Sequence, residues 1–379
     1  MLMVITEVVV HTVPMSASWL TEGLIANPMS GYPQYRERRA SWFGSMTAAV
    51  VELRAGEGLS GLGYVGGGKG GAAKSVVEEH FAQLLTGQDP FDIERLWDQL
   101  YRASVMYGRR GLALEALSAV DIALWDLVGK AAGQPVYRLI GGRTKPRLRA
   151  YVTGNLTERH LAEGFRDVKL ALPHGPADGE AGLRANEDLV RRTRERIGPE
   201  GDLMLDCYMA LDVPYTIELA RRLRDYRIRW IEEPVLPDQI DSYRRIRDAI
   251  DIPIAGGEHE FTRFGFRELI EKRAVDILQP DIYRAGGISE LKKIAAMASA
   301  YDIPVIPHGV GAPTYHFVMS TVNAPKVEFV DIFASGGELL LEGEPVPRGG
   351  WVELGGEPGF GYQLNPRALR GEVPVAPIW

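Results

Sequence analysis

The sequence predicts an α/β protein whose main domain is a (β/α)8 barrel of the TIM type, joined to a smaller α+β domain. Two changes in the spacing of apolar residues predict this division. Up to about residue 65 apolar residues alternate as in strands, and from residue 74 to residue 129 they recur as in helices. Beyond that, short β-rich runs alternate with amphipathic helices. A chain of 379 residues can bury one large core and a smaller one.

Eight β-rich runs predict the strands of the barrel. Each is followed by a helical stretch, which is the pattern of repeated βα units. We expect the barrel domain to span residues 129–334. The predicted strands are 148–153, 165–172, 202–206, 227–233, 252–258, 275–281, 303–308 and 327–333.

Residues 1–128 are expected to form the smaller domain, which would cap the barrel. Strands are predicted in the runs VITEVVVHTV, TAAVVELRAG and GLGYVGG, and helices in AAKSVVEEHFAQLL, IERLWDQLYRAS and LEALSAVDIALWDLVGKAAG. The last helix should end near Gly133 and Pro135, which are typical terminating residues. Residues 335–379 carry proline and glycine with little helical period, and we expect them to pack back on the capping domain and complete it.

Charge and cysteine content exclude several classes of protein. A net charge of −7 and a pI near 5.7 argue against non-specific binding to nucleic acid or to an anionic membrane. Cys207 is the only cysteine, so no intramolecular disulfide and no cysteine-based zinc site can form. The start MLMVITEVVV lacks a basic segment and is interrupted by Glu7, which is untypical of an export signal. We therefore expect a cytoplasmic protein that acts on a small molecule.

Three acids end neighbouring predicted strands: Asp206, Glu232 and Glu258. The active site of such a barrel lies at the carboxyl ends of its strands, so these side chains should meet at the mouth. Converging carboxylates repel one another unless a cation lies between them. A single acid at a strand end is more often a helix cap or a solvated charge, but three at matched positions predict a metal site. An all-oxygen set suits Mg²⁺ better than Zn²⁺.

Other polar residues follow at the same level of the barrel. Glu233 alternates to the opposite face from its neighbour, so an ion pair or a supporting role is expected rather than metal ligation. Lys169 lies in the second strand, Asp281 ends the sixth and His308 ends the seventh. A lone histidine after a strand is more often structural. Paired with Asp281 above a metal site, however, His308 would have a fixed tautomer and a raised basicity, which favours catalysis.

These residues together resemble the enolase superfamily in its mandelate racemase subgroup, where three carboxylates bind the metal and a lysine and an Asp–His pair face the substrate. The segment DIALWDLVGKAAGQPVYRLIGG (121–142) is similar to the family's domain junction, and LQPDIYRAGGIS to its sixth strand and the following turn. Within the subgroup the sequence most resembles the L-rhamnonate dehydratases. The passages that carry this likeness are ANPMSGYPQYRERRASWFG (26–44), HGPADGEAG (174–182), LMLDCYMALDV (203–213) and GGEHE (256–260).

The resemblance implies a hydro-lyase that uses Mg²⁺ and converts a sugar acid, with L-rhamnonate as the expected substrate, to a 2-keto-3-deoxy acid. His308 would take the proton α to the carboxylate and return it to the departing β-hydroxyl, while Lys169 adds positive charge beside the substrate carboxylate. Glu328 would hydrogen-bond that carboxylate in its protonated form, which requires a raised pKa. Arg39 and His259 are expected to bind substrate, and the subunits to form a homo-oligomer.

Two departures from the family pattern bear on function. Racemases of the subgroup carry Lys-x-Lys in the second strand, whereas this chain has Ala171 at the second lysine position. With a base on one face of the substrate carbon, elimination is favoured over racemisation. The dehydratases also have a histidine in the N-terminal lid that SASWLTEG lacks, and Trp42 and Phe43 lengthen the stretch after Arg39 by one residue. These differences leave the identity of the sugar acid open.

Two alternative functions remain. The first is a racemase or epimerase of a 2-hydroxy acid on the same scaffold, and the second is a non-catalytic barrel that binds a carboxylate. The second is expected to have lost Lys169, His308 or a metal carboxylate, and all are present.

Two glycine motifs resemble nucleotide-binding sequences. GLGYVG (61–66) lacks the βαβ return of a dinucleotide site, and GGGKGG (66–71) has Gly70 where a P-loop needs Ser or Thr. We interpret this region as a glycine-rich turn that faces the barrel mouth.

Overall fold

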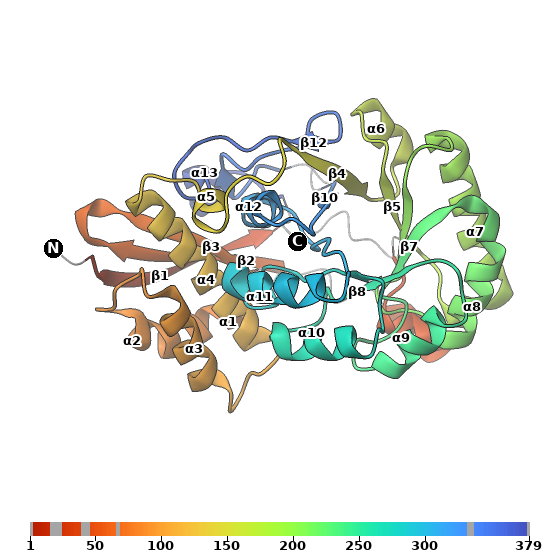
Figure 1. Cartoon of the computed structure of the whole chain (residues 1–379), viewed down its shortest axis with the longest axis horizontal. Coiled ribbons are helices and arrows are strands. Elements are labelled where there is room, and N and C mark those ends of the chain that lie inside the picture. Colours follow the sequence, from red (N-terminus) through yellow and green to blue (C-terminus); the bar gives the residue numbers. More distant parts are fainter. Residues whose placement is uncertain (1–2, 16–24, 39–45, 66–68, 332–336, 377–379) are drawn as a thin grey trace.

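The structure is a computed structural model that describes residues 3–15, 25–38, 46–65, 69–331 and 337–376. N-terminal strands and helices form one body, and the barrel strands with their helices form a second body beside it (Figure 1). The C-terminal segment, drawn in dark blue, runs over both.

The capping domain is a three-stranded antiparallel sheet covered by helices. The strands lie in the order β1 (Ile5–Met15), β2 (Met46–Ala55) and β3 (Ser60–Val65). The helical part comprises α1 (Gly70–Val76), a π-helical turn (Val77–Phe81), α2 (Ala82–Leu85), α3 (Ile93–Ser104) and α4 (Leu112–Ala131). Most of α4 is apolar and buried, because it lies between β3 and the barrel helix α11 (Gly287–Ser299).

Glycines in β3 let this strand pack closely against α4. A Cβ atom on Gly61 would lie 2.1 Å from the carbonyl oxygen of Ala123, and one on Gly63 would lie 1.8 Å from that of Ala119. Both positions therefore require glycine. The strand predicted in GLGYVGG is confirmed for residues 61–65, whereas the interpretation of these residues as a turn is wrong, and helix packing accounts for the spacing of the two glycines.

Seven parallel strands form the continuous part of the barrel, in the order β10-β4-β5-β6-β7-β8-β9. Residues 303–308 take the remaining place through the single bridges Leu278–Val305 and Asp281–His308. Pro304 and Pro307 interrupt regular pairing there, because proline has no N–H to donate. The fold class is confirmed. The strands are β4 (Leu148–Thr153), β5 (Val168–Ala171), β6 (Leu203–Asp206), β7 (Ile228–Glu232), β8 (Ile254–Gly256), β9 (Ile277–Leu278) and β10 (Lys326–Val330).

Helices cover the outside of the barrel and follow the strands in turn (Figure 1). They are α6 (Thr157–Ala162), α7 (Gly179–Ile197), α8 (Val213–Arg222), α9 (Ile240–Arg247), α10 (Thr262–Glu271), α11 and α12 (Ala312–Ser320). A short helix, α5 (Val136–Leu139), joins α4 to the barrel. None of the helices in the described ranges is long and apolar enough to span a membrane.

An apolar layer fills the middle of the barrel. It consists of Tyr151, Met204, Trp230, Ala255, Ile277 and Ile306. Near the amino ends of the strands, Arg149 and Lys326 form ion pairs with Asp167, and Lys326 also pairs with Asp202. Near the carboxyl ends lie Lys169 and the acids predicted to form the site. The candidate site therefore has an apolar floor.

The C-terminal segment contacts both bodies. The Tyr362 hydroxyl donates to the Leu62 carbonyl at 2.8 Å and the Phe360 amide donates to Asp126 at 2.9 Å, so the segment completes the capping domain as predicted. It also adds β12 (Trp351–Val352) antiparallel to β4, which was not predicted. The division at residues 128 and 334 stays a prediction. The other elements of the segment are β11 (Leu341–Glu342), β13 (Gln363–Leu364) and α13 (Pro366–Leu369).

A buried histidine ties α12 to α5 and to the C-terminal segment. His316 accepts a hydrogen bond at Nδ1 from the Tyr137 amide at 3.1 Å, and its ring packs edge-on against Phe360. Burial lowers the pKa of His316 to about 3. The folded state therefore binds fewer protons here than the unfolded chain, whose histidine pKa is about 6.5. The stability that neutral His316 contributes is complete above pH ~6.5 and is lost as the pH falls toward 3.

We predict that His316→Gln reduces the loss of stability between pH 7 and pH 4. Urea unfolding at several pH values would measure this, with His80→Gln as a control because His80 lies near the surface beside Tyr107. Equal pH dependence in wild type and His316→Gln would contradict a buried neutral imidazole.

Candidate active site

A buried lysine lies among three carboxylates at the carboxyl end of the barrel. Lys169 Nζ is 2.5 Å from Glu232 Oε1, 2.9 Å from Glu328 Oε1 and 3.6 Å from Asp206 Oδ2. Burial opposes its charge, but the attraction of these acids is larger and raises the pKa of Lys169 well above its ordinary value. These acids therefore favour the charged form of Lys169, which lies just above the apolar floor of the site.

Two of the predicted metal ligands occupy paired positions on β6 and β7. Asp206 lies opposite Glu232 in the strand register. Glu232 Oε2 accepts from Gln279 Nε2 at 2.6 Å and from Trp230 Nε1 at 3.2 Å. Burial is the largest cause that raises the pKa of Glu232 to about 8 and that of Asp206 to about 6. Repulsion from neighbouring carboxylates adds to this effect, and the attraction of Lys169 opposes it.

The third predicted ligand, Glu258, lies among basic groups. Arg284, itself buried, places Nη1 2.6 Å from Glu258 Oε1 and Nε 3.5 Å from Asp281 Oδ2. The Nε2 atoms of His308 and His259 each lie 3.5 Å from the same Glu258 oxygen. Burial acts to raise the pKa of Glu258, but the two imidazoles and Arg284 outweigh it and lower that pKa.

Asp281 and His308 form the predicted pair. His308 Nδ1 is 2.9 Å from Asp281 Oδ2, and Asp281 Oδ1 accepts from the Tyr283 amide at 2.7 Å. With Nδ1 bound to Asp281, Nε2 of His308 faces Glu258 and Glu328. Burial acts to lower the pKa of His308, but these carboxylates and Asp281 raise it to about 9. Asp281 thus fixes the ring orientation and its tautomer.

The surroundings of Glu328 favour its ionised form in this arrangement rather than the predicted protonated form. Its Oε1 accepts from the Thr153 hydroxyl and from Lys169, and its Oε2 accepts from the Gly309 amide at 3.0 Å. Burial would raise the pKa of Glu328, but Lys169 and His308 outweigh it and lower that pKa. Both oxygens of Glu328 accept hydrogen bonds and the group lies beside Lys169, and its protonated role toward the substrate stays a prediction.

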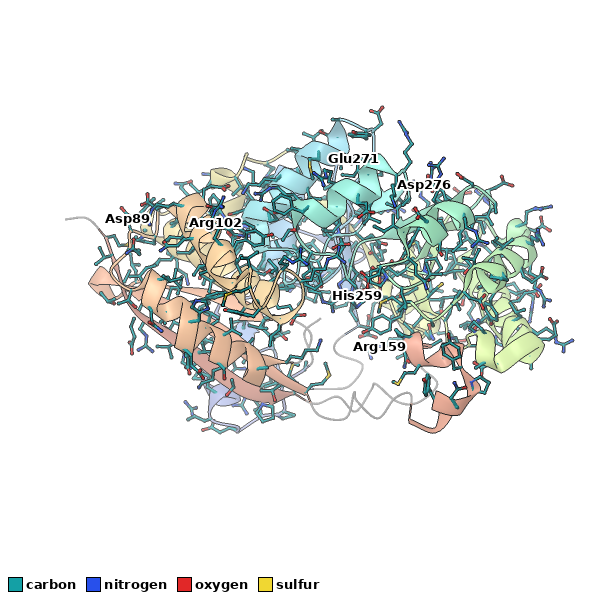
Figure 2. All side chains as sticks on the ribbon, turned by 90° about the horizontal axis from the view of Figure 1, so that it is seen from below. Asp89, Arg102, Arg159, His259, Glu271 and Asp276 are labelled. Atoms are coloured by element: carbon teal, nitrogen blue, oxygen red, sulfur yellow. The ribbon has the colours of Figure 1, made fainter. Side chains whose placement is uncertain are left out.

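Glu233 and His259 form a second acid–imidazole pair at the rim. Glu233 Oε2 lies 2.6 Å from His259 Nδ1, and Oε1 accepts from the amides of Gly257 and His259. In the described residues, the group of potential metal ligands whose donor atoms all lie within 4.8 Å is Glu233, Glu258 and His259. His259 lies between the capping helices and the barrel helices (Figure 2), and its side chain is 20% exposed.

The structure brings nearly all of the predicted site residues into one layer. Arg39, SASWLTEG, Trp42 and Phe43 lie outside the described residues. The adjoining part of that region packs on the barrel through the Ala26 amide, which donates to the Leu172 carbonyl at 2.7 Å. The short helix η1 (Pro28–Gly31) contacts η6 (Pro176–Asp178), and η2 (Pro33–Arg38) contacts η1. The residues gathered in the layer are Lys169, Asp206, Glu232, Glu258, His259, Asp281, His308 and Glu328.

Three contributors were missed in the sequence: Thr153, Gln279 and Arg284. Gln279 precedes Asp281 by two residues in LQPDIYRAGGIS, so strand alternation from Asp281 could have placed it inward. Thr153 ends β4 as the acids end their strands. Arg284 lies in the turn after β9, where no period predicts the direction of a side chain.

Family comparisons agree with this geometry. Residues 153–368 match the family described as "Enolase C-terminal domain-like", and residues 41–141 match "Mandelate racemase / muconate lactonizing enzyme, N-terminal domain". The chain therefore belongs to the mandelate racemase and muconate lactonizing enzyme family of the enolase superfamily, which confirms the resemblance.

Among individual relatives, the chain is 42% identical over 351 residues to the L-rhamnonate dehydratase of Saccharopolyspora erythraea, covering 90% of each chain. The crystal structure of rhamnonate dehydratase from Gibberella zeae complexed with Mg superposes with a TM-score of 0.90 at 39% identity, covering 98% of this chain and 96% of that one. A racemase from Streptomyces coelicolor with bound magnesium gives a TM-score of 0.83 at 28% identity, covering 98% of this chain and all of the racemase chain (100%).

We predict that Arg284→Met destabilises the protein by about 3–5 kcal/mol in metal-free buffer, because it leaves the buried Glu258 and Asp281 without their shared cation. Urea unfolding would measure this loss. Arg102→Met is the control, since that arginine pairs with Asp98 on the surface and its loss should leave the midpoint nearly unchanged. Equal midpoints for the two variants would show that Arg284 does not balance these acids.

Proposed function

We propose that the protein is a Mg²⁺-dependent acid sugar dehydratase, with L-rhamnonate as the leading substrate. One observation carries the reaction type: a single Asp281–His308 pair faces the mouth above Lys169 and its carboxylates. Ala171 lies at the second lysine position, and its backbone is fixed by two hydrogen bonds with the side-chain amide of Asn155. The methyl group of Ala171 supplies no second base. A base on one face of the substrate carbon suits elimination.

We propose Asp206, Glu232 and Glu258 as the ligands of the ion. The burial of these three carboxylates close to one another and the all-oxygen donor set fit Mg²⁺. Glu233 is already hydrogen-bonded to the His259 ring and to two backbone amides, which suits the pair to orienting neighbouring groups. When bound, the ion supplies positive charge to the substrate carboxylate and to the enediolate that forms on proton loss.

The chain's own residues account for the proton movements. His308 Nε2 takes the proton from the carbon α to the carboxylate, and Asp281 stabilises the resulting imidazolium. A cation held by Glu258 would offset the negative charge that favours the imidazolium, which would lower the pKa of His308 and make the neutral ring available as a base. The imidazolium then protonates the departing β-hydroxyl on the same face. Lys169, held by Glu232 and Glu328, adds positive charge beside the substrate carboxylate.

A racemase or epimerase is the second candidate, since a racemase shares the fold closely. It requires a base on each face of the carbon, and Ala171 argues against it. The expected cytoplasmic location and homo-oligomeric assembly stay proposals, as does substrate binding by Arg39 and His259.

A panel of aldonic and aldaric acids, assayed for keto-acid formation with Mg²⁺ present, tests the proposed function. We expect L-rhamnonate to be among the best substrates. If no acid in the panel yields a keto acid, the proposed activity is wrong.

The ligand assignment predicts opposite results for two neighbouring glutamates. Glu232→Gln should abolish Mg²⁺ binding in calorimetry and the activity with it, because it removes one of three ligand charges. Glu233→Gln should retain Mg²⁺ with at most about a tenfold loss of affinity, as expected for a supporting group. Retention by Glu232→Gln together with loss in Glu233→Gln would place the ion at Glu233, Glu258 and His259 instead.

The role of His308 predicts that His308→Asn lowers kcat by at least ~10³ while Mg²⁺ and substrate still bind. It should also stop exchange of the substrate α-proton with solvent, because abstraction itself fails. Asp281→Asn should be milder, since the base remains but loses its orienting charge. Proton exchange at the wild-type rate in His308→Asn would point to another base, with Lys169 as the first candidate.

A further inference from the structure

We infer that Asp121, on helix α4 of the capping domain, is a positioning residue for the active site. It binds the amino end of α11, the helix that follows the turn carrying Asp281 and Arg284. The inference rests on the proposed function for its kinetic consequence, whereas its structural part can be tested separately.

Helix α11 lacks an N-terminal cap of its own. The cap position is Gly286, which has no side chain and a φ of +119°. Two amides at this helix end are instead bound from α4: Asp121 Oδ2 accepts from the Ser289 amide at 3.1 Å, and Ser118 Oγ accepts from the Gly286 amide at 2.9 Å. A side chain at the cap position ordinarily binds the amide that Asp121 binds here. The capping domain thus supplies the helix cap for the barrel.

Helices α3 and α4 of the capping domain both contact this helix end, α3 through Trp97 and α4 through Trp125. Trp97 Nε1 donates to the Gly286 carbonyl at 2.7 Å, and Trp125 Nε1 donates to Ser289 Oγ at 3.0 Å. A Cβ atom on Gly287 would lie 2.3 Å from Asp121 Oδ2, so only glycine fits beside the carboxyl group. The start of α11 is therefore held in one position relative to α4.

The burial of Asp121 reduces the stability of the folded protein. It is 1% exposed, and in the described part of the chain its Oδ1 has no hydrogen-bond partner. Burial also raises its pKa to about 7, which shows that its charge is poorly compensated. A buried acceptor without a partner reduces stability. Its position at the base of the catalytic turn offers a reason for this cost.

The turn before α11 carries the constraint to the site. The amides of Arg284 and Ala285 donate to the Asp281 carbonyl at 3.1 and 2.8 Å, and the Gly287 amide donates to the Ile282 carbonyl at 3.2 Å. Because this turn is short and leads directly into α11, it should move together with that helix. This turn carries two side chains of the candidate site. Asp281 orients His308, and Arg284 binds Glu258. Release of Asp121 should therefore misplace the base.

Asp126 provides a matched control. It lies on the same helix and is also buried, but it accepts from the Leu62 and Phe360 amides, each at 2.9 Å, and pairs with Lys130. These partners belong to β3, the C-terminal segment and α4 itself, and none lies in the turn 281–287. Asp126→Ala should cost stability without moving the base.

The test compares Asp121→Ala, Asp121→Asn and Asp126→Ala with the wild type after wild-type dehydration has been measured. Hydrogen exchange followed by mass spectrometry should show faster exchange in residues 281–290 for Asp121→Ala alone. Its kcat should fall about tenfold to a hundredfold, and the isotope effect on kcat with C2-deuterated substrate should rise as proton abstraction becomes slower. Asp121→Asn should retain most of the wild-type kcat and most of the protection from exchange in residues 281–290, since its side-chain oxygen can still accept from the Ser289 amide.

A merely structural role predicts other results. A smaller active fraction lowers kcat but changes neither KM nor the isotope effect, and it affects Asp126→Ala equally. Unchanged exchange in residues 281–290, or an unchanged isotope effect in Asp121→Ala, would overturn the inference. If Asp121→Ala does not fold, Ser118→Ala removes the hydrogen bond to the Gly286 amide instead. This variant should show the same changes in exchange, kcat and isotope effect to a smaller extent. An inactive wild type would reject the proposed function but leave the exchange measurement as a test of the helix cap.

Discussion

The active site depends on the burial of six carboxyl groups at one end of the barrel. Uncompensated charges of this density would be expelled from a protein interior or neutralised by protonation. Two buried permanent cations, Lys169 and Arg284, bring the acids together, and each contacts at least two of them. The remaining negative charge accounts for the affinity for a divalent cation that we propose. The six acids are Asp206, Glu232, Glu233, Glu258, Asp281 and Glu328.

Two other parts of the fold border this charged layer. Beneath it, the apolar layer around Trp230 and Tyr151 closes the interior of the barrel. Beside it, α4 of the capping domain holds the start of α11 and with it the turn that carries Asp281 and Arg284. The capping domain thus shapes the catalytic layer through the backbone, in addition to any contact with substrate. Precise placement of a base is worth orders of magnitude in rate, which gives such a contact a function.

The sequence predicts the fold class, the family and most members of the site, because strand ends recur in register. Alternation from the apolar Trp230 and Ile231 is enough to place Glu232 in the mouth. Three features depend on contacts between distant segments and could not be predicted. The charge of Glu328 is set by Lys169 from another strand and by the Gly309 amide. The pairing of β12 with β4 is only two residues long. The close packing of Gly61 and Gly63 involves α4, a helix distant from them in the sequence.

The central claim is that one base, on one face of the substrate carbon, removes a proton and drives loss of the β-hydroxyl. Proton NMR of the wild-type reaction with L-rhamnonate and Mg²⁺ in D₂O tests it most directly. The account predicts a 2-keto-3-deoxy acid with deuterium at C3, introduced when the enol product ketonises, and no inversion at C2 in recovered substrate. Recovered acid that is deuterated and inverted at C2, without keto-acid formation, would contradict the account and identify a racemase.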